Sequence, residues 1–321
     1  MSQSTLDSAL AQIEKTPNVK VLVFTGGEPT LKGVKLLNAI ERGSKMGLVT
    51  RLVTNSWWAT TQEKANECVN KLKNAGLTEI NTSFDDYHAK FVSIGNICRF
   101  TKAALDNHLA VAIATVVDSY SKIDSDFVKV KIGEYLGMTT DELMTKVVFM
   151  EDLPSLNGRG RKLGLDSGRV PIRNDLRKES GCTSIIEDIS IHPNGDVKVC
   201  CGHAMIESQD LTAGNLNSDS FKNILYKAQR NLGYWLIHSV GPTKLLTDIG
   251  VEGDYTNICH ACGELLTNHH EDFVTYIREN KGNLIMNEVL LGDTIRRELR
   301  KVKIIEKPSK KTQQNTSSGE T

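Results

Sequence analysis

The sequence lacks three features that would assign it to common functional classes. Its longest apolar runs, such as residues 109–117, are too short to cross a bilayer. Lys plus Arg equal Asp plus Glu at 39 each, so no net charge favours nucleic acid or a strongly charged partner. Residues 1–7 show no basic stretch leading into an apolar one, so no signal peptide is visible. These absences predict a cytoplasmic protein with neither a membrane nor a nucleic acid as partner.

Cysteine is unevenly distributed along the chain. No cysteine precedes Cys68, whereas five of the seven lie between Cys182 and Cys262. In a reducing compartment, cysteines at C-x-x-C spacing favour metal binding over disulfide formation. The clustered cysteines therefore predict a metal or iron–sulfur site in the second half of the chain.

Short apolar segments alternate with amphipathic ones over the first 150 residues. The pattern predicts strands at 19–24, 48–54, 80–84, 111–117 and 147–150, and helices at 5–14, 31–46, 60–75, 91–107 and 126–136. Thr60 and Glu63 predict a capping box for the third of these helices. Alternation of this kind implies a parallel sheet or barrel with its functional groups at the C-terminal ends of the strands.

The second half of the chain has a different pattern. A turn at 192–196 joins segments 185–191 and 197–199 into a predicted hairpin that delivers Cys200. Helical patterns return at 219–240 and 270–303, and the polar tail from Lys307 predicts disorder. We therefore expect a second, smaller unit.

One loop of the first half has the composition of a ligand site. Gly26 and Gly27 follow a predicted buried strand and allow a ligand to approach the backbone, and Glu28 offers a carboxylate to an ammonium group. No Lys-Ser/Thr pair follows, so the segment is not a phosphate loop. On composition alone, a plain strand–helix turn is an equal alternative.

Phe24-Thr25-Gly26-Gly27-Glu28-Pro29-Thr30-Leu31 resembles the Gly-Gly-Glu-Pro motif of radical S-adenosylmethionine (SAM) enzymes. Val53-Thr54-Asn55-Ser56 resembles that family's TNG strand end, with Ser56 where glycine is usual. Residues 81–88 resemble its SxDxxxH-like strand end, and residues 157–160 its GR(G/A) segment. The resemblance covers residues 19–165 and implies an α/β fold, a partial (β/α)6 TIM-like barrel. The residues that it implies for binding SAM are Gly26, Gly27, Glu28, Pro29, Asn55, Ser83 and Asp85.

The chain departs from this family at the catalytic cluster. The family binds a [4Fe–4S] cluster through C-x-x-x-C-x-x-C upstream of Gly-Gly-Glu-Pro, and no cysteine occurs there. Without that cluster, reductive cleavage of SAM has no electron source. We therefore expect the chain as written to be inactive, with SAM and the catalytic cluster bound only if a preceding segment supplies the ligands. A degenerate member that has lost its first barrel strand is the alternative.

Residues around the clustered cysteines resemble the SPASM or twitch-type extension of radical-SAM enzymes. The matching segments are 181–182, 192–202, 214–216 and 259–263. The resemblance implies an auxiliary [4Fe–4S] cluster on Cys182, Cys200, Cys259 and Cys262, and a peptide substrate. The same four thiolates could hold structural zinc, although the isolated Cys182 does not suit a zinc ribbon.

These resemblances together imply four segments. They are a barrel lacking its first strand at 1–165, a small α+β iron–sulfur domain at 166–275, a helical segment at 276–306 and a tail at 307–321.

Vicinal thiols seldom both bind one iron site, so one of Cys200 and Cys201 is expected to be free. Cys201 could donate a hydrogen atom to a substrate radical, as implied by a comparable Cys-Cys pair in peptide epimerases; buried packing or alternative ligation is the other interpretation. The resemblance thus predicts Cα hydrogen abstraction from a ribosomal peptide, with epimerisation as the outcome and a reducing electron donor as partner. Crosslinking, and a non-catalytic iron–sulfur or zinc module that binds a peptide, are the alternatives.

Overall fold

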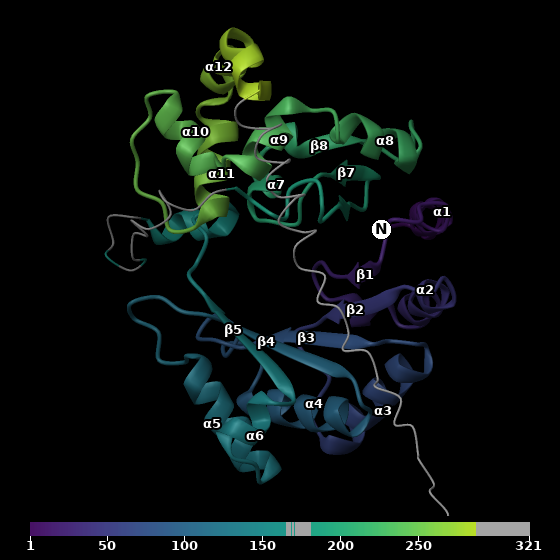
Figure 1. The fold of residues 1–321 in the computed structure, drawn as a ribbon. Coiled ribbons are helices and arrows are strands. Elements are labelled where there is room, and N and C mark those ends of the chain that lie inside the picture. Colours follow the sequence, from purple (N-terminus) through teal and green to yellow (C-terminus); the bar gives the residue numbers. More distant parts are fainter. Residues whose placement is uncertain (165–167, 169, 171–180, 287–321) are drawn as a thin grey trace, which may run out of the picture.

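The computed structural model describes residues 1–164, 168, 170 and 181–286. They form two units, one on a five-stranded parallel sheet and one on a three-stranded antiparallel sheet (Figure 1). The predicted segments beyond residue 286, including the tail from Lys307, lie outside the described residues. The predicted boundary at residue 275 falls inside a helix, so the last described helix continues the second unit.

The larger sheet follows chain order, β1-β2-β3-β4-β5, with every neighbouring pair parallel. Its strands are β1 Val21–Phe24, β2 Val49–Val53, β3 Glu79–Ser83, β4 Ala110–Val116 and β5 Val147–Asp152. The helices of this unit are α1 Gln3–Ile13, η1 Pro29–Lys32, α2 Val34–Lys45, α3 Gln62–Asn74, α4 Ile94–Asp106, α5 Ser125–Leu136, α6 Thr140–Met144 and η2 Gly158–Leu163. Five parallel strands in sequential order, with helices between them, confirm the predicted α/β class.

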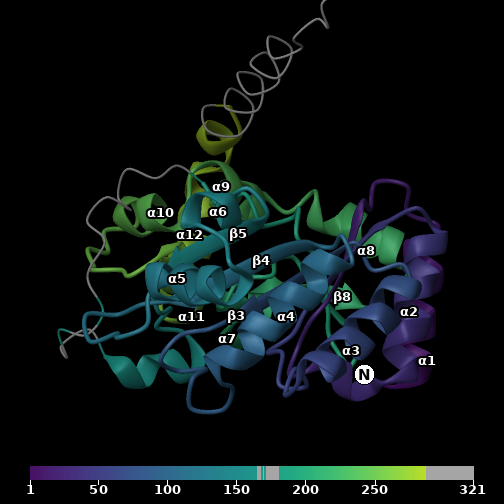
Figure 2. The same ribbon diagram turned by 90° about the horizontal axis from the view of Figure 1, so that it is seen from below.

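Within the described residues, helices cover one face of this sheet. Leu52, Ile80 and Ile113 point to the same side and are completely buried against α3 and α4, whose ribbons lie across the sheet in Figure 2. Side chains alternate along a strand, so the residues between them point to the opposite face. That second face, which we call the open face, carries Val23, Val148 and other residues that stay largely exposed.

The smaller unit pairs β6 with β7 and β7 with β8, both antiparallel. Its elements are β6 Ser190–Ile191, β7 Asp196–Lys198, β8 Thr212–Asn215, α7 Ala204–Glu207, η4 Gln209–Leu211, α8 Phe221–Ala228, α9 Leu232–Ser239, α10 Pro242–Asp248, α11 Ile258–Thr267 and α12 His270–Asn283. Its apolar core joins α9, α10 and α11 and includes Cys200 and Cys262. The predicted hairpin is present, and the predicted helix over 219–240 is two helices, because Asn231 caps a new helix at Leu232.

The two units are joined at two places. Ala9 and Ile13 of α1 pack with Phe221 and Ile224 of α8. At the other end, the Glu207 carboxylate of α7 accepts hydrogen bonds from the segment after β5. The donors are Asn157 Nδ2, the Gly158 amide, and Arg161 Nε and Nη2. The 157–160 segment that resembles a family motif therefore forms a clasp between the two units.

After β2, one sequence expectation needs correction, and one departure from the family pattern has a structural explanation. The capping residue of α3 is Thr61, whose hydroxyl accepts from Lys64 N, so the predicted Thr60–Glu63 box is wrong by one residue. Ser56 has φ of 59°, the left-handed region, which explains why glycine is usual at this position of the family pattern. Ser56 is fully buried, and its hydroxyl lies 3.0 Å from Thr82 Oγ1.

Replacing Ser56 tests this backbone strain. Ser56→Gly and Ser56→Ala both remove the hydroxyl. Only glycine adopts the left-handed conformation without strain, which for other residues costs about 1–2 kcal/mol. We expect Ser56→Gly to be more stable than Ser56→Ala by about 1 kcal/mol in urea unfolding. Equal stability of the two variants would show that position 56 is unstrained.

The clasp predicts an acid-sensitive stability. Arg161, together with the Gly158 amide and Asn157, lowers the pKa of Glu207 from 4.5 to about 2. A depressed carboxyl pKa contributes stability above the ordinary value and loses it as pH falls from about 4.5 towards 2. Urea midpoints of the metal-free protein are expected to fall over that window, and to fall less for Glu207→Gln. An unchanged pH dependence in Glu207→Gln would exclude the clasp as its source.

Candidate functional site

The Gly26–Pro29 loop lies where β1 ends and leaves its backbone accessible. Gly26 and Gly27 are exposed, and a Cβ atom added at either would meet no atom within 4 Å. Gly26 has φ of 109°, which a side chain rarely adopts, so this turn requires glycine. The loop therefore leaves room for a ligand to contact the main chain, as the resemblance to SAM sites implies.

Glu28 does not present a free carboxylate at this loop. Its Oε1 accepts from the Thr30 amide and hydroxyl and, at 2.8 Å, from the Thr54 hydroxyl. Its Oε2 accepts from the Asn55 amide at 2.8 Å. Glu28 thereby ties the end of β1 to the end of β2, and the main chain of Gly26 and Gly27 is left as the accessible part of the loop. Pro29 is buried, as the first residue of η1.

Asp85, at the end of β3, likewise connects two strand ends through hydrogen bonds. Its side chain is completely buried, and it accepts from the amides of Tyr87, His88 and Val116 and from His88 Nδ1 at 2.8 Å. Burial opposes ionisation, but these donors, led by the His88 ring, give a net lowering of the Asp85 pKa. Asp85 therefore joins the ends of β3 and β4, whereas Ser83 is half-buried on the open face.

Four cysteine sulfurs approach one another in the smaller unit. Cys182 precedes β6, Cys200 follows β7, and Cys259 and Cys262 lie one turn apart in α11. The charges of Cys182 and Cys259 raise the pKa of both Cys200 and Cys262, and the charge of Cys200 also raises the pKa of Cys262. The α11 helix was not among the predicted elements, although its C-x-x-C spacing puts both cysteines on one face.

Local structure fixes the position of each sulfur. Gly181 has φ of 79°, and a Cβ there would lie 2.1 Å from the His238 carbonyl oxygen, so glycine lets Cys182 approach α9. The Cys182 amide donates to the Ile237 carbonyl at 3.0 Å. Gly202 packs closely on Cys259 as well, since a Cβ at Gly202 would lie 2.7 Å from that sulfur.

The electrostatics of these thiols suit a bound cation. Burial raises the pKa of Cys200 to about 12, and the charges of Cys259 and Cys182 act in the same direction. A hydrogen bond from the Gly202 amide acts in the opposite direction. Burial and the three other sulfurs raise the pKa of Cys262 well above its ordinary value. Thiolates form in such surroundings when a metal cation compensates their charge. Backbone amides of Gly202, His203 and Ala204 also point at Cys200 or Cys259.

The donor set thus fits an iron–sulfur cluster, which takes four cysteine thiolates. Among the residues that the structure describes, no group of three or more His, Cys, Asp or Glu side chains is arranged to hold a metal ion. Cys68 and Cys98 lie on α3 and α4, packed in or against the core of the larger unit, as the sequence indicated. The described residues therefore offer no cysteine set for a second, catalytic cluster.

Cys201 differs from its four neighbours. It is the exposed one of the five clustered cysteines, and its Sγ lies 3.7 Å from Asp188 Oδ2 as a hydrogen-bond donor. Cys200 is buried among the other sulfurs. This arrangement favours Cys200 as the ligand and leaves Cys201 free, and the interpretation of Cys201 as buried packing is wrong. The part played by Asp188 carried no sequence signal, because 13 residues separate it from Cys201.

Comparisons with known proteins bear on this site. Residues 182–263 match the SPASM family, described as an iron–sulfur cluster-binding domain. The chain is 22% identical over 277 residues to a Bacillus subtilis (strain 168) protein named "Putative peptide biosynthesis protein YydG", covering 83% of this chain and 82% of that one. The resemblance to radical-SAM proteins with a SPASM-type domain is thereby confirmed.

Two solved structures of BtrN are also similar at 11% identity. The open conformation matches with a TM-score of 0.40 over 81% of this chain and 78% of that chain. The complex of BtrN with AdoMet and 2-DOIA matches with a TM-score of 0.45 over 76% of this chain and 77% of that chain. In the described part of this chain, no helix has the length and apolar character needed to cross a bilayer.

The cysteine assignment predicts a clear difference between two adjacent variants. After anaerobic reconstitution, we expect about four iron atoms per cluster site in the unaltered protein and in Cys201→Ser, because Cys201 is not a ligand. Cys200→Ser is expected to lose most of this iron, and Cys68→Ser serves as a control outside the site. Iron and sulfide analysis would contradict the assignment if Cys201→Ser lost iron as Cys200→Ser does, or if zinc alone were bound.

Proposed function

We propose that the protein modifies a peptide, and that its C-terminal domain returns a hydrogen atom to a Cα carbon from the Cys201 thiol. The similarity to a protein named for peptide biosynthesis supports a peptide as substrate. The match to an iron–sulfur cluster-binding domain supports a cluster on Cys182, Cys200, Cys259 and Cys262. The outcome we favour is epimerisation, in the cytoplasm, where reducing conditions keep the thiols available.

The observation that carries this proposal is the position of Cys201. It is an exposed thiol next in sequence to the buried Cys200, and its hydrogen is directed to the Asp188 carboxylate. A hydrogen-atom donor has to be protonated before it reacts. Partial burial and the adjacent Asp188 charge raise the pKa of Cys201, which favours the S–H form.

The hydrogen-return step balances when an electron donor is included. The S–H bond of Cys201 breaks homolytically as a new C–H bond forms on the substrate Cα radical, leaving a sulfur-centred radical. One electron and one proton then restore the thiol, and a one-electron reductant has to supply that electron. Delivery of the hydrogen to the face opposite the one from which it was removed inverts the Cα configuration.

The earlier abstraction step needs a radical source beyond the residues around Cys201. SAM bound with a catalytic cluster supplies the hydrogen-abstracting radical in the family that the chain resembles. The accessible main chain of Gly26 and Gly27 fits the SAM part, and we propose Asn55 and Ser83, at the ends of β2 and β3, as further contacts. The described residues hold no ligand set for that cluster, so the step requires ligands from elsewhere.

Peptide stereochemistry tests the proposal. Peptides that differ between cells with the intact gene and cells with Cys201→Ser are collected, hydrolysed in deuterated acid and analysed on a chiral column. We expect a D-amino acid at unchanged peptide mass in the first strain and its absence in the second. Asn70→Ala, an exposed change on α3, is the matched control.

Two other results would replace the proposal. A peptide lighter by two hydrogen atoms would assign crosslinking to the protein. Absence of any altered peptide would favour the non-catalytic binding module.

A further inference from the structure

Two adjacent tryptophans follow β2, and they differ in their exposure. Trp58 is 9% exposed, and its ring packs edge-on against Phe100 in the core of the larger unit. Trp57 is 46% exposed, although a tryptophan ring gains much from burial. Packing therefore accounts for Trp58, whereas a large part of the Trp57 side chain stays available to a ligand.

Both indole groups are linked to the carboxylate of Glu28. Trp57 Nε1 donates to the Thr30 hydroxyl at 3.3 Å, and that hydroxyl donates to Glu28 Oε1. Trp58 Nε1 donates to the Thr54 hydroxyl at 3.2 Å, which donates to the same oxygen at 2.8 Å. The hydrogen bond to Thr30 therefore holds the exposed ring of Trp57 beside the glycine loop that follows β1.

This hydrogen-bond chain makes the face of the Trp57 ring a better site for a cation. An N–H group that donates to a hydroxyl is polarised further when that hydroxyl donates to a carboxylate. Aromatic rings attract cations to their faces, and tryptophan does so most strongly. The net charge of residues 24–34 does not contribute, because Glu28 and Lys32 are their charged members and have opposite signs. A preference for a cation therefore comes from the ring itself.

The ligand that the glycine loop fits carries such a cation. SAM has a sulfonium sulfur between its amino acid part and its adenosyl part, and the accessible main chain of Gly26 and Gly27 fits the SAM site. We propose that the exposed ring of Trp57 binds the sulfonium group of SAM. This inference rests on the proposed function, because it takes SAM as the ligand of the glycine loop.

A neutral analogue separates this contact from other contacts to SAM. S-adenosylhomocysteine keeps the adenosyl part and the amino acid part, but its sulfur is an uncharged thioether. Main-chain contacts to the amino acid part and stacking on the adenine are therefore the same for both compounds. Only a contact that depends on the positive charge favours SAM.

Nuclear magnetic resonance of the full chain tests the inference without any measurement of activity. The three tryptophans give three indole N–H signals, and Trp57→Leu assigns that of Trp57. Gly27→Ala assigns the Gly27 amide, since a Cβ there meets no atom within 4 Å. SAM and S-adenosylhomocysteine are titrated separately, and the shifts give both dissociation constants.

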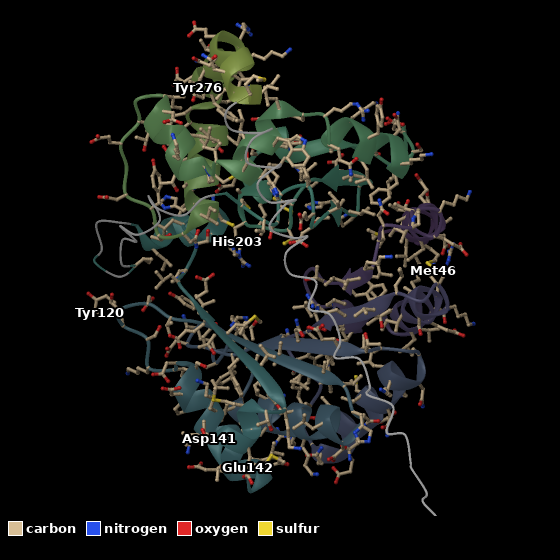
Figure 3. All side chains as sticks on the ribbon, viewed as in Figure 1. Met46, Tyr120, Asp141, Glu142, His203 and Tyr276 are labelled. Atoms are coloured by element: carbon tan, nitrogen blue, oxygen red, sulfur yellow. The ribbon has the colours of Figure 1, made fainter. Side chains whose placement is uncertain are left out.

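Two further variants complete the series. Trp57→Phe keeps an aromatic ring but loses the indole N–H. Tyr276→Leu removes an aromatic side chain of α12, which lies on the far side of the smaller unit from the five-stranded sheet (Figure 3), and serves as the control. Circular dichroism shows that the variants are folded.

We expect SAM to shift the signals of Trp57 and Gly27 together and to bind about three- to fivefold more tightly than S-adenosylhomocysteine, as a cation–π contact at a partly exposed site predicts. Trp57→Leu should bring this ratio to about one, because the charge-dependent contact is lost. Trp57→Phe should give an intermediate ratio, and Tyr276→Leu should leave it unchanged.

Equal affinity of the unaltered protein for the two compounds, or an unchanged ratio in Trp57→Leu, would overturn the inference. A shift of the Gly27 signal without one of Trp57 would also overturn it and would leave SAM at the glycine loop. If SAM shifted neither signal, both the inference and the SAM part of the proposed function would fail. The two failures are therefore distinguishable in one titration.

Discussion

The smaller unit depends on four neighbouring cysteines, of which Cys200 and Cys262 are buried and Cys182 and Cys259 half-buried. Uncompensated thiolates would repel one another in that environment, and burial and mutual charge already raise the pKa of Cys200 and Cys262. The iron–sulfur cluster that we propose on these cysteines would remove this repulsion and link β7, α11 and the segment before β6. Cys200 and Cys262 belong to the apolar core that holds α9, α10 and α11 together, and Cys182 packs against it.

In the larger unit, two carboxylates, one half-buried (Glu28) and one buried (Asp85), hold the C-terminal ends of neighbouring strands at a fixed spacing. Glu28 joins β1 to β2, and Asp85 joins β3 to β4, each through several hydrogen bonds to backbone and side-chain donors. These two residues shape the edge where ligands of parallel sheets bind. The groups left for direct contact are the main chain of Gly26 and Gly27 and the side chains of the open face.

The alternation of apolar and amphipathic segments was sufficient to predict the five strands and their helices, because each pattern extends over the whole length of one strand or one helix. The ligand set of the clustered cysteines stays a prediction, and the exposed Cys201 agrees with a free second thiol. Four features were not predicted. The clasp of Glu207 on Arg161 and the contact of Asp188 with Cys201 join distant residues, and the internal bonding of Glu28 depends on how β1 and β2 align. The helix α11 escaped prediction because its 10 residues carry little periodicity.

The central claim is that Cys200 binds the cluster while its neighbour Cys201 stays free to react. An anaerobic crystal structure with data at the iron absorption edge tests it directly. The account predicts an iron cluster bounded by the sulfurs of Cys182, Cys200, Cys259 and Cys262, with Cys201 Sγ outside it and near Asp188. A bond between Cys201 and the metal, or a single zinc ion among the four sulfurs, would contradict it.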